Sequence, residues 1–235
     1  MSDRYFLALD EILARVREAN RDSIADAAAI VADTIAADGI VHAFGSGHSQ
    51  LLAIELAGRA GGLAGIQVIL DPGQGKAETL EGYAATIVRD YAFEPRDCLI
   101  VISNSGRNPS PIEMAMMGRE HGMKVIAVTA ADFSRSVSSR HSSGRRLLDL
   151  ADVVLDTRGA AGDAAVHIEG APADVGPTST VVGAALLNAV MAEAVAELVR
   201  RGVPPPILVS QNTDNFAEHN EALRRRYAGR IRSVT

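Results

Sequence analysis

The first forty residues carry hydrophobic side chains at helical spacing. Apolar residues recur three or four positions apart, which is the spacing of one face of an α-helix; they are Phe6, Leu9, Leu13, Val16, Ile24, Ala28, Val31 and Ile35. The pattern predicts one long helix, or two in succession, over residues 4–38. Gly39 ends this helical region.

Short apolar runs follow, and stretches with helical patterning separate most of them. The runs predict strands at residues 40–44, 66–70, 98–102, 125–129 and 153–155, and helices are predicted at 51–60, 78–91, 111–121, 179–201 and 216–227. Continuous apolar strands that alternate with helices are typical of a parallel sheet covered on both faces. We therefore expect an α/β protein, a three-layer αβα sandwich with a central, mostly parallel sheet.

Nothing in the sequence divides the chain into separate units. It has no internal repeat and no low-complexity linker, so the prediction is one domain over residues 1–235. Its parts are the N-terminal helices 4–38, an α/β core at 39–201 and a C-terminal tail at 202–235. The polar, serine-rich stretch 134–146 is expected to be a mobile excursion.

Composition and charge exclude several classes of protein. The formal net charge of −6 argues against general nucleic-acid binding. No run of eighteen apolar residues predicts a membrane span, and no basic segment followed by an apolar stretch predicts a signal peptide. The single cysteine, Cys98, allows no internal disulfide and lies in an apolar run, so it is interpreted as a core residue. A cytoplasmic protein is expected.

The candidate chemistry lies in loops after the strands, because ligands bind beyond the carboxyl ends of the strands in open parallel sheets. In the first loop, residues 44–50, glycines surround Ser46, His48 and Ser49 before a predicted helix, as in anion-binding loops. A dinucleotide-binding loop is an alternative, since Asp71 ends the next strand. Gln50, however, stands where that motif has its third glycine.

Two further loops carry small polar side chains that can donate hydrogen bonds. Ser103, Asn104, Ser105 and Asn108 follow the third predicted strand, and such a cluster can satisfy phosphate oxygens. The alternative is a plain helix cap with a turn. Residues 176–180 open the long helix 179–201 with consecutive hydroxyl residues, among them Thr178 and Ser179. One of these caps the helix, and another is predicted to face a ligand.

The order of these three loops resembles the sugar isomerase (SIS) domain family, whose fold is a flavodoxin-like three-layer sandwich. The resemblance covers roughly residues 24–201. It implies that the Ser-x-Ser-Gly loop holds a substrate phosphate, which assigns this role to Ser103, Ser105 and Asn108. It also implies self-association through the N-terminal helices, as a homodimer or homotetramer, and sites completed by a neighbouring subunit.

Two branches of this family imply different catalytic residues. The segment Glu55-Leu56-Ala57-Gly58-Arg59 is similar to one in phosphoheptose isomerases, which implies proton transfer by Glu55. The segments at residues 80–82 and 105–109 are similar to N-acetylmuramic acid 6-phosphate etherases, which implies that Glu81 is the acid/base. His219, in the tail, is a further candidate for opening a sugar ring. The chain is shorter than the etherases and most similar to small single-SIS proteins of bacteria.

The leading hypothesis is therefore a lyase that acts on an amino-hexose 6-phosphate such as N-acetylglucosamine 6-phosphate. Glu81 would abstract a proton and a substituent would leave by β-elimination, without a cofactor or a metal. One alternative is an aldose–ketose isomerase or deaminase of a hexosamine or heptose phosphate. Another is a non-catalytic sugar-phosphate sensor. The sequence leaves open the reaction, the stereochemistry of the sugar, the subunit number and the subunit in which His219 acts.

Overall fold

Two helices in succession form the N-terminus. The computed structural model describes residues 3–160, 162–212, 214 and 216–232, with α1 at Arg4–Ala19 and α2 at Arg21–Ala36. They meet at Asn20, whose side chain is buried and accepts a hydrogen bond from the Asp156 N–H (2.7 Å). Its amide donates to the carbonyls of Val16 (2.7 Å) and Asp156 (2.9 Å). The break between the helices is thus tied to the end of a distant strand.

The central sheet is parallel throughout. Its strands are β1 (Val41–Gly45), β2 (Ile66–Ile69), β3 (Cys98–Ile102), β4 (Lys124–Thr129) and β5 (Val153–Asp156), in the order β2-β1-β3-β4-β5. This is the flavodoxin-like order, and it confirms the predicted sheet. Because the strands are parallel, the loops that follow them all lie along one edge of the sheet. We refer to it as the carboxyl edge.

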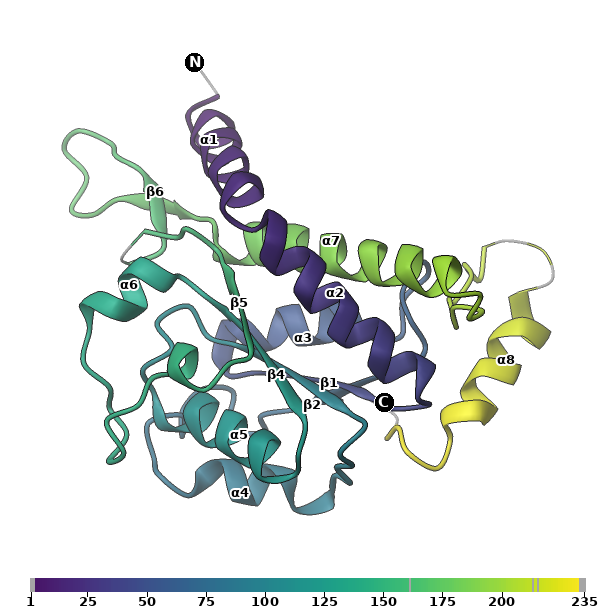
Figure 1. Cartoon of the computed structure of the whole chain (residues 1–235). Coiled ribbons are helices and arrows are strands. Elements are labelled where there is room, and N and C mark those ends of the chain that lie inside the picture. The colour runs from purple at the N-terminus through teal and green to yellow at the C-terminus, as the bar shows by residue number, and fades with distance from the viewer. Residues whose placement is uncertain (1–2, 161, 213, 215, 233–235) are drawn as a thin grey trace.

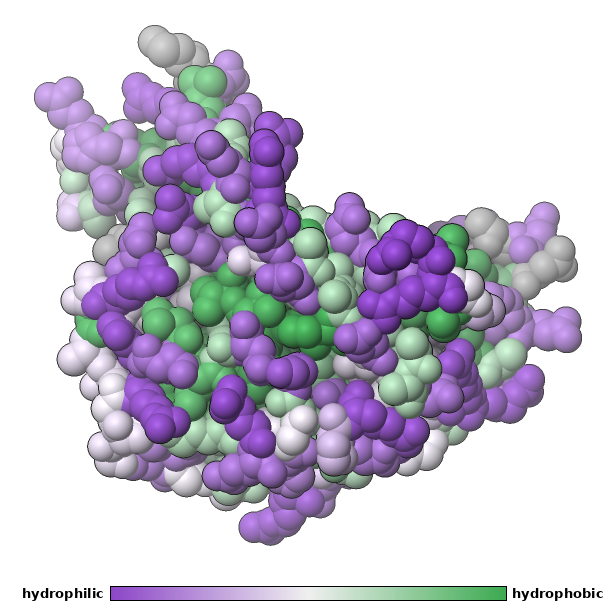
Figure 2. Space-filling view, viewed as in Figure 1, coloured by the Kyte–Doolittle hydropathy of each residue, from purple (hydrophilic) through white to green (hydrophobic). Residues whose placement is uncertain are grey.

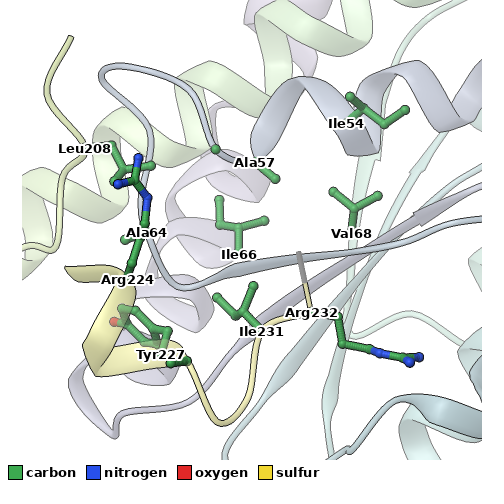
Figure 3. A pocket seen from close by; sticks show the side chains of 12 residues that line it. Ile54, Ala57, Ala64, Ile66, Val68, Leu208, Arg224, Tyr227, Ile231 and Arg232 are labelled. Atoms are coloured by element: carbon green, nitrogen blue, oxygen red, sulfur yellow. The ribbon is translucent and has the colours of Figure 1, made fainter. Parts of the chain in front are cut away.

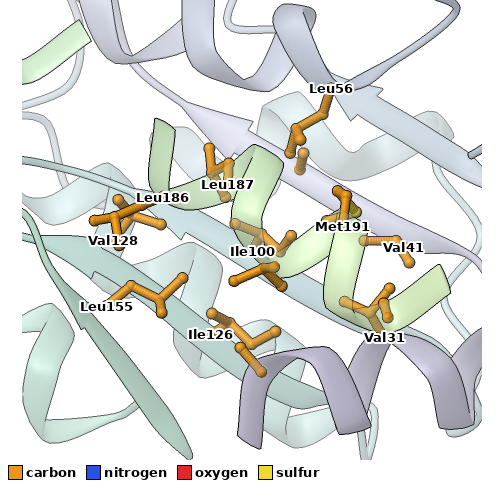
Figure 4. Packing of buried hydrophobic residues seen from close by; sticks show 14 of the residues in the cluster. Val31, Val41, Leu56, Ile100, Ile126, Val128, Leu155, Leu186, Leu187 and Met191 are labelled. Carbon is orange, nitrogen blue, oxygen red and sulfur yellow. The ribbon is translucent and has the colours of Figure 1, made fainter. Parts of the chain in front are cut away.

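Helices cover both faces of the sheet, which confirms the predicted three layers (Figure 1). On one face lie α2, α3 (Gln50–Leu56) and α7 (Ser179–Arg200), and on the other α4 (Tyr83–Ile87) and α5 (Pro109–Glu120). Successive residues of β3 alternate between them: Ile100 packs under α7, whereas Leu99 and Val101 pack with α5. Figure 4 shows the first cluster, with Leu186 and Met191 of α7 over the strands.

Helix α7 is long and apolar enough, by length and composition, to cross a membrane, and it is the one helix of the described residues with this property. Its buried side chains pack against α2 and the sheet, and they include Val182, Leu186, Leu187, Val190 and Leu198. Its place in the core therefore accounts for part of the hydrophobicity of α7, while Val181 and Val199 are exposed.

The prediction of one helix over residues 78–91 is wrong. Successive turns cover residues 72–82, and the helix begins only at Tyr83, after Gly82 in a left-handed conformation (φ 82°). Gly75 (φ 85°) makes a second such turn earlier in the segment. Glycine adopts these angles without strain, so the segment folds back along the carboxyl edge. A short 3₁₀ turn, Val88–Asp90, ends the region.

Several elements lie outside the sheet. They are α6 (Ala131–Ser136), α8 (Phe216–Tyr227), 3₁₀ turns at Gly47–Ser49 and Leu147–Asp149, and an antiparallel pair of β6 (Ala164–Val166) with β7 (Val175–Pro177). The sequence predicted α8 but neither α6 nor the β6–β7 pair. The pair projects beside α1 (Figure 1), and the Tyr5 hydroxyl of α1 donates to the Pro177 carbonyl (2.8 Å).

Hydrophobic side chains also reach the surface. Figure 2 shows them gathered in the middle of one face, in the region where Figure 1 places β5 and α2. On α1, Phe6 and Leu7 are 64% and 63% exposed. Self-association through the N-terminal helices stays a prediction, and these are the side chains that it would cover.

Candidate functional site

A cavity of about 590 Å³ lies at the carboxyl edge of the sheet. The loops after β1, β2 and β3 and the start of α7 line it, together with residues near α6 and β6. Of the residues predicted to bind substrate, eight line this cavity: Ser46, His48, Ser49, Ser103, Asn104, Ser105, Asn108 and Ser179. Thr178 does not line it and is buried. The lining residues that the sequence analysis missed include Gln74, Lys76, Glu78, Phe133 and Asp163.

A buried carboxylate fastens the first loop to the segment after β2. Asp71 accepts hydrogen bonds from the hydroxyls of Ser46 (2.5 Å) and Tyr83 (2.8 Å) and from the N–H groups of Gly73 (2.9 Å) and Gly75 (2.8 Å). Burial raises the pKa of Asp71, but these bonds outweigh it and leave the pKa below its usual value. Since the Ser46 proton goes to Asp71, Ser46 offers a ligand only a hydrogen-bond acceptor.

This arrangement does not favour the dinucleotide alternative. Asp71 is 1% exposed, so it presents no carboxylate to a ribose. Gln50 has a structural purpose, because its side-chain oxygen accepts the Asp71 N–H (2.5 Å). Gly47 and Gly75, both at positive φ, lie back to back, and a Cβ added at Gly75 would lie 3.0 Å from the Gly47 Cα. The glycines here bring two loops together.

The Ser-x-Ser-Gly loop leaves a hydroxyl free. Ser103 Oγ accepts the Gly106 N–H (3.2 Å), and Asn104 Oδ1 accepts the Thr157 hydroxyl (3.3 Å). Ser105 Oγ, by contrast, has no hydrogen-bond partner among the described residues. In the loops after β1 and β2, the side chains of His48, Ser49 and Lys76 likewise have no hydrogen-bond partner among the described residues. The Gln74 amide is unpaired as well, so five side chains that can donate hydrogen bonds line the cavity without a partner among the described residues.

The third loop meets a carboxylate of its own chain. Asp163 accepts hydrogen bonds from the N–H groups of Thr178 (3.2 Å) and Ser179 (2.8 Å) and from the Ser179 hydroxyl (2.5 Å). A carboxylate is favoured at the N-terminus of a helix, where backbone N–H groups lack intrahelical partners. The start of α7 is therefore already capped, and Ser179 has no proton left for a ligand.

Asn108 contacts protein groups rather than open space. Its Nδ2 donates to Glu78 Oε1 (2.6 Å), and its Oδ1 accepts from Arg140 Nη1 (3.1 Å). The side chain is 8% exposed. Glu78, which the sequence analysis took as part of a helix, is half-buried and lines the cavity.

The predicted catalytic residues do not line this cavity within one chain. Glu81 is exposed and accepts two hydrogen bonds from Ser142, from its N–H (2.6 Å) and its hydroxyl (2.7 Å). These bonds lower the pKa of Glu81. A proton-transfer carboxylate at neutral pH needs a pKa raised toward neutrality instead. Glu81 thus binds Ser142, which lies in the stretch 134–146 that was predicted to be mobile.

Glu55 and His219 lie elsewhere. Glu55 forms an ion pair with Arg59, and both side chains are about half exposed on or just beyond α3. They line a separate, mostly apolar hollow with Leu51 and Ile54. His219 is exposed in α8, where its Nε2 lies 2.8 Å from the Ile207 carbonyl oxygen. Neither residue lines the carboxyl-edge cavity of the chain.

A second hollow of about 550 Å³ lies at the free edge of β2, beneath the tail (Figure 3). Ile54 of α3, Ile66 and Val68 of β2 and Tyr227 of α8 line it, with the guanidinium groups of Arg224 and Arg232 near it. Its side chains are mostly apolar, and the loop hydroxyls are absent from its lining. The cavity at the carboxyl edge therefore offers a polar ligand more side-chain hydrogen-bonding groups than this hollow does.

The one cysteine of the chain lies in the core. Burial raises the pKa of Cys98 to about 12, which agrees with its interpretation as a core residue. Among the described residues, no group of three or more His, Cys, Asp or Glu side chains is arranged to hold a metal ion.

Comparison with known proteins places the chain in a family. Residues 4–130, more than half of the chain, match the SIS domain, so the chain belongs to the SIS domain family. This confirms the resemblance found in the sequence. Within the family, the chain is similar to UPF0309 protein lmo0025 of Listeria monocytogenes, which is 43% identical over 227 residues covering 97% of each chain.

Solved structures agree on the fold. The phosphoheptose isomerase GmhA of Neisseria gonorrhoeae superposes with a TM-score of 0.54 at 19% identity, over 81% of this chain and 93% of that one. The NanR protein of Vibrio vulnificus, solved in complex with ManNAc-6P, gives a TM-score of 0.50 at 16% identity, over 97% of this chain and 67% of that one. At these identities the likeness establishes the SIS fold.

Proposed function

We propose that this protein is an enzyme that binds a phosphorylated amino sugar in the carboxyl-edge cavity. The observation that carries the proposal is the set of side chains there that are unpaired among the described residues: His48, Ser49, Gln74, Lys76 and Ser105. These donors are exposed or half-buried and converge on one cavity, so they are available for a ligand rich in acceptor oxygens. A phosphate on a sugar is such a ligand, and Lys76 adds a cation for its charge.

The proposed reaction is β-elimination from an N-acetylhexosamine 6-phosphate in its open-chain form. A carboxylate takes the proton from C2, the C3–O bond breaks, and the C3 hydroxyl leaves as water after receiving a proton. The similarity to etherase segments supports this chemistry, and the structural neighbour NanR is complexed with an amino-sugar phosphate. We further propose that the protein works in the cytoplasm as a homodimer or homotetramer, needing no cofactor.

An aldose–ketose isomerase is the second candidate. It begins with the same proton abstraction beside the carbonyl, and the proton then returns to C1 rather than a group leaving from C3. The observations that favour it are the fold shared with a phosphoheptose isomerase and the Glu55–Arg59 segment. Glu55 would then have to enter the cavity of a neighbouring subunit, because it lies outside the cavity of its own.

The test is incubation of the purified protein with N-acetylglucosamine 6-phosphate, followed by mass spectrometry and NMR of the products. Loss of one water establishes elimination. Aldose–ketose isomerisation needs a hydroxyl on C2, so it is tested in parallel with hexose and heptose phosphates, for which an unchanged mass with a shifted sugar isomer establishes it. Binding of the sugar phosphate by calorimetry without any conversion contradicts an enzyme and leaves a sugar-phosphate sensor. Absence of both binding and conversion for hexosamine, hexose and heptose phosphates contradicts the proposed ligand.

A further inference from the structure

Two carboxylates line the cavity, and their partners differ. Asp163 uses both oxygens to cap α7, as described above. Glu78 uses Oε1 to accept from Asn108, and its Oε2 has no partner among the described residues. Glu78 is therefore the carboxylate at this cavity with an oxygen free to meet a substrate.

The backbone of Glu78 is fixed from both sides. Its N–H donates to the Gly75 carbonyl (3.3 Å), within the turns that glycine permits after β2. Its carbonyl accepts the N–H of Ser110 (3.1 Å), in the first turn of α5. That N–H has no partner inside the helix, so Glu78 completes the start of α5 while its side chain remains at the cavity.

The side chain of Glu78 is oriented by a directed chain of hydrogen bonds. Arginine only donates, so Arg140 Nη1 requires the Asn108 oxygen as its acceptor (3.1 Å). This fixes the orientation of the Asn108 amide and points its N–H₂ group at Glu78 Oε1 (2.6 Å). Arg140 is itself positioned, because its N–H donates to the Arg107 carbonyl (2.8 Å). One carboxylate oxygen is thus held and the other is free.

We propose that Glu78 is the proton-transfer residue of the carboxyl-edge cavity and that Asn108 positions it, with Arg140 fixing the Asn108 amide. The inference rests on the proposed function. In the elimination, Glu78 takes the C2 proton and leaves an enolate, and in the next step the C3–O bond breaks, C2 and C3 become doubly bonded, and Glu78 passes a proton to the departing oxygen. Water leaves, Glu78 is a carboxylate again, and nothing is oxidised or reduced. Asn108 then serves Glu78 rather than the phosphate.

The experiment measures exchange of the C2 proton of N-acetylglucosamine 6-phosphate with solvent deuterium, alongside product formation. Proton abstraction is common to elimination and isomerisation, so exchange reports on the residue whichever reaction follows. Glu78→Gln is expected to lower turnover and exchange by roughly 100-fold or more, with calorimetric affinity for the sugar phosphate unchanged. Glu78→Asp keeps the carboxylate but draws it back by one methylene, so its turnover and exchange should fall less than those of Glu78→Gln. Glu120→Gln, exposed at the end of α5, is the matched control.

The competing glutamate is tested in the same way. Glu81→Gln is expected to keep most of the exchange, because Glu81 bonds to Ser142 and does not line the cavity. If Glu81→Gln loses the exchange of the C2 proton and Glu78→Gln keeps it in full, the assignment of Glu78 is overturned and the proposed function still stands. No turnover or exchange by the unmodified protein on any hexosamine or heptose phosphate would overturn both.

Asn108 has a readout of its own. As a positioning residue, Asn108→Ala should lower kcat by roughly 10-fold or more and leave KM within about twofold. If Asn108 instead holds the phosphate, KM rises while kcat is kept, and the positioning role is wrong. Thermal melting of each variant ensures that the comparison is between folded proteins.

Discussion

The two ends of the strands in the parallel sheet use polar side chains in opposite ways: the carboxyl edge, and the opposite edge at which the strands begin, which we call the amino edge. At the amino edge, Asp97 is fully buried and accepts hydrogen bonds from the N–H groups of Ile40 (2.9 Å) and Glu94 (2.8 Å). His42 Nε2 lies 3.3 Å from it, and the tail residue Arg230 donates to both of its oxygens (3.0 and 2.7 Å). At the carboxyl edge, donors such as Ser105 face a cavity unpaired.

Position alone does not explain this difference. Asp71 lies at the carboxyl edge, yet it is as buried and as fully bonded as Asp97. It holds two loops in place beneath the cavity. What separates groups that maintain the fold from groups that are available to a ligand is whether the protein has already paired them. Substitutions should therefore divide into those that change stability and those that change binding.

The largest effect is expected at Asp97. Asp97→Ala leaves His42 and two backbone N–H groups without their acceptor and leaves Arg230 with Glu94 as its carboxylate partner. Removing one partner of a buried ion pair costs about 3–5 kcal/mol. Urea unfolding followed by circular dichroism measures this loss. The matched control is Asp132→Ala, whose carboxylate is 79% exposed beside arginines on the surface. Equal stability of the two variants would mean that the amino-edge network does not maintain the fold.

The same residue predicts a pH dependence. Burial raises the pKa of Asp97, but hydrogen bonds from His42, Ile40 and Glu94 outweigh this and hold the pKa at about 2, below the ordinary 3.8. A carboxyl group whose pKa is lower in the folded than in the unfolded protein stabilises the folded state at every pH above its unfolded pKa. This stabilisation is lost as the pH falls through the folded pKa. We therefore expect the free energy of unfolding to lose the contribution of Asp97, about 2 kcal/mol, as the pH falls from roughly 4 to 2.

Since other carboxylates also titrate in this range, the measurement is a difference. Unfolding free energies of the unmodified protein and of Asp97→Asn are compared across the pH range. The gap between them should narrow as the pH falls from roughly 4 to 2. A constant gap would show that Asp97 ionises alike in the folded and unfolded chains.

The sequence predicted the fold well where local pattern decides it. The strand 98–102 and the helix 216–227 have the predicted bounds, because each is bounded by polar or turn-forming residues. The segment 72–82 was missed although Gly73, Gly75 and Gly82 mark it as turns. The short pair β6–β7 depends on packing against α1, which no local pattern reveals.

The site was predictable to the extent that it lies in loops directly after strands. Residues 46–49 and 103–108 follow β1 and β3, and the strand-end rule finds both. Glu78 was not found, because turns place it at the cavity where a helix was predicted, and its contacts there are with Asn108 and Ser110, which are distant in sequence. Glu81 was predicted from the resemblance, but it does not line the cavity, whereas Glu78, three residues earlier in the sequence, does.

The smallest effect, and the one that separates the two edges most cleanly, is expected at Ser105. Because its hydroxyl has no protein partner in the described residues, Ser105→Ala should change the free energy of unfolding by less than about 0.5 kcal/mol. The affinity for N-acetylglucosamine 6-phosphate should fall by roughly tenfold or more, since one hydrogen bond to an ionised phosphate is lost. Calorimetric titration measures this, with Ser23→Ala in α2 as the control. A loss of stability with unchanged affinity would make Ser105 a structural residue like those at the amino edge. The reverse result would locate the phosphate in the loop after β3.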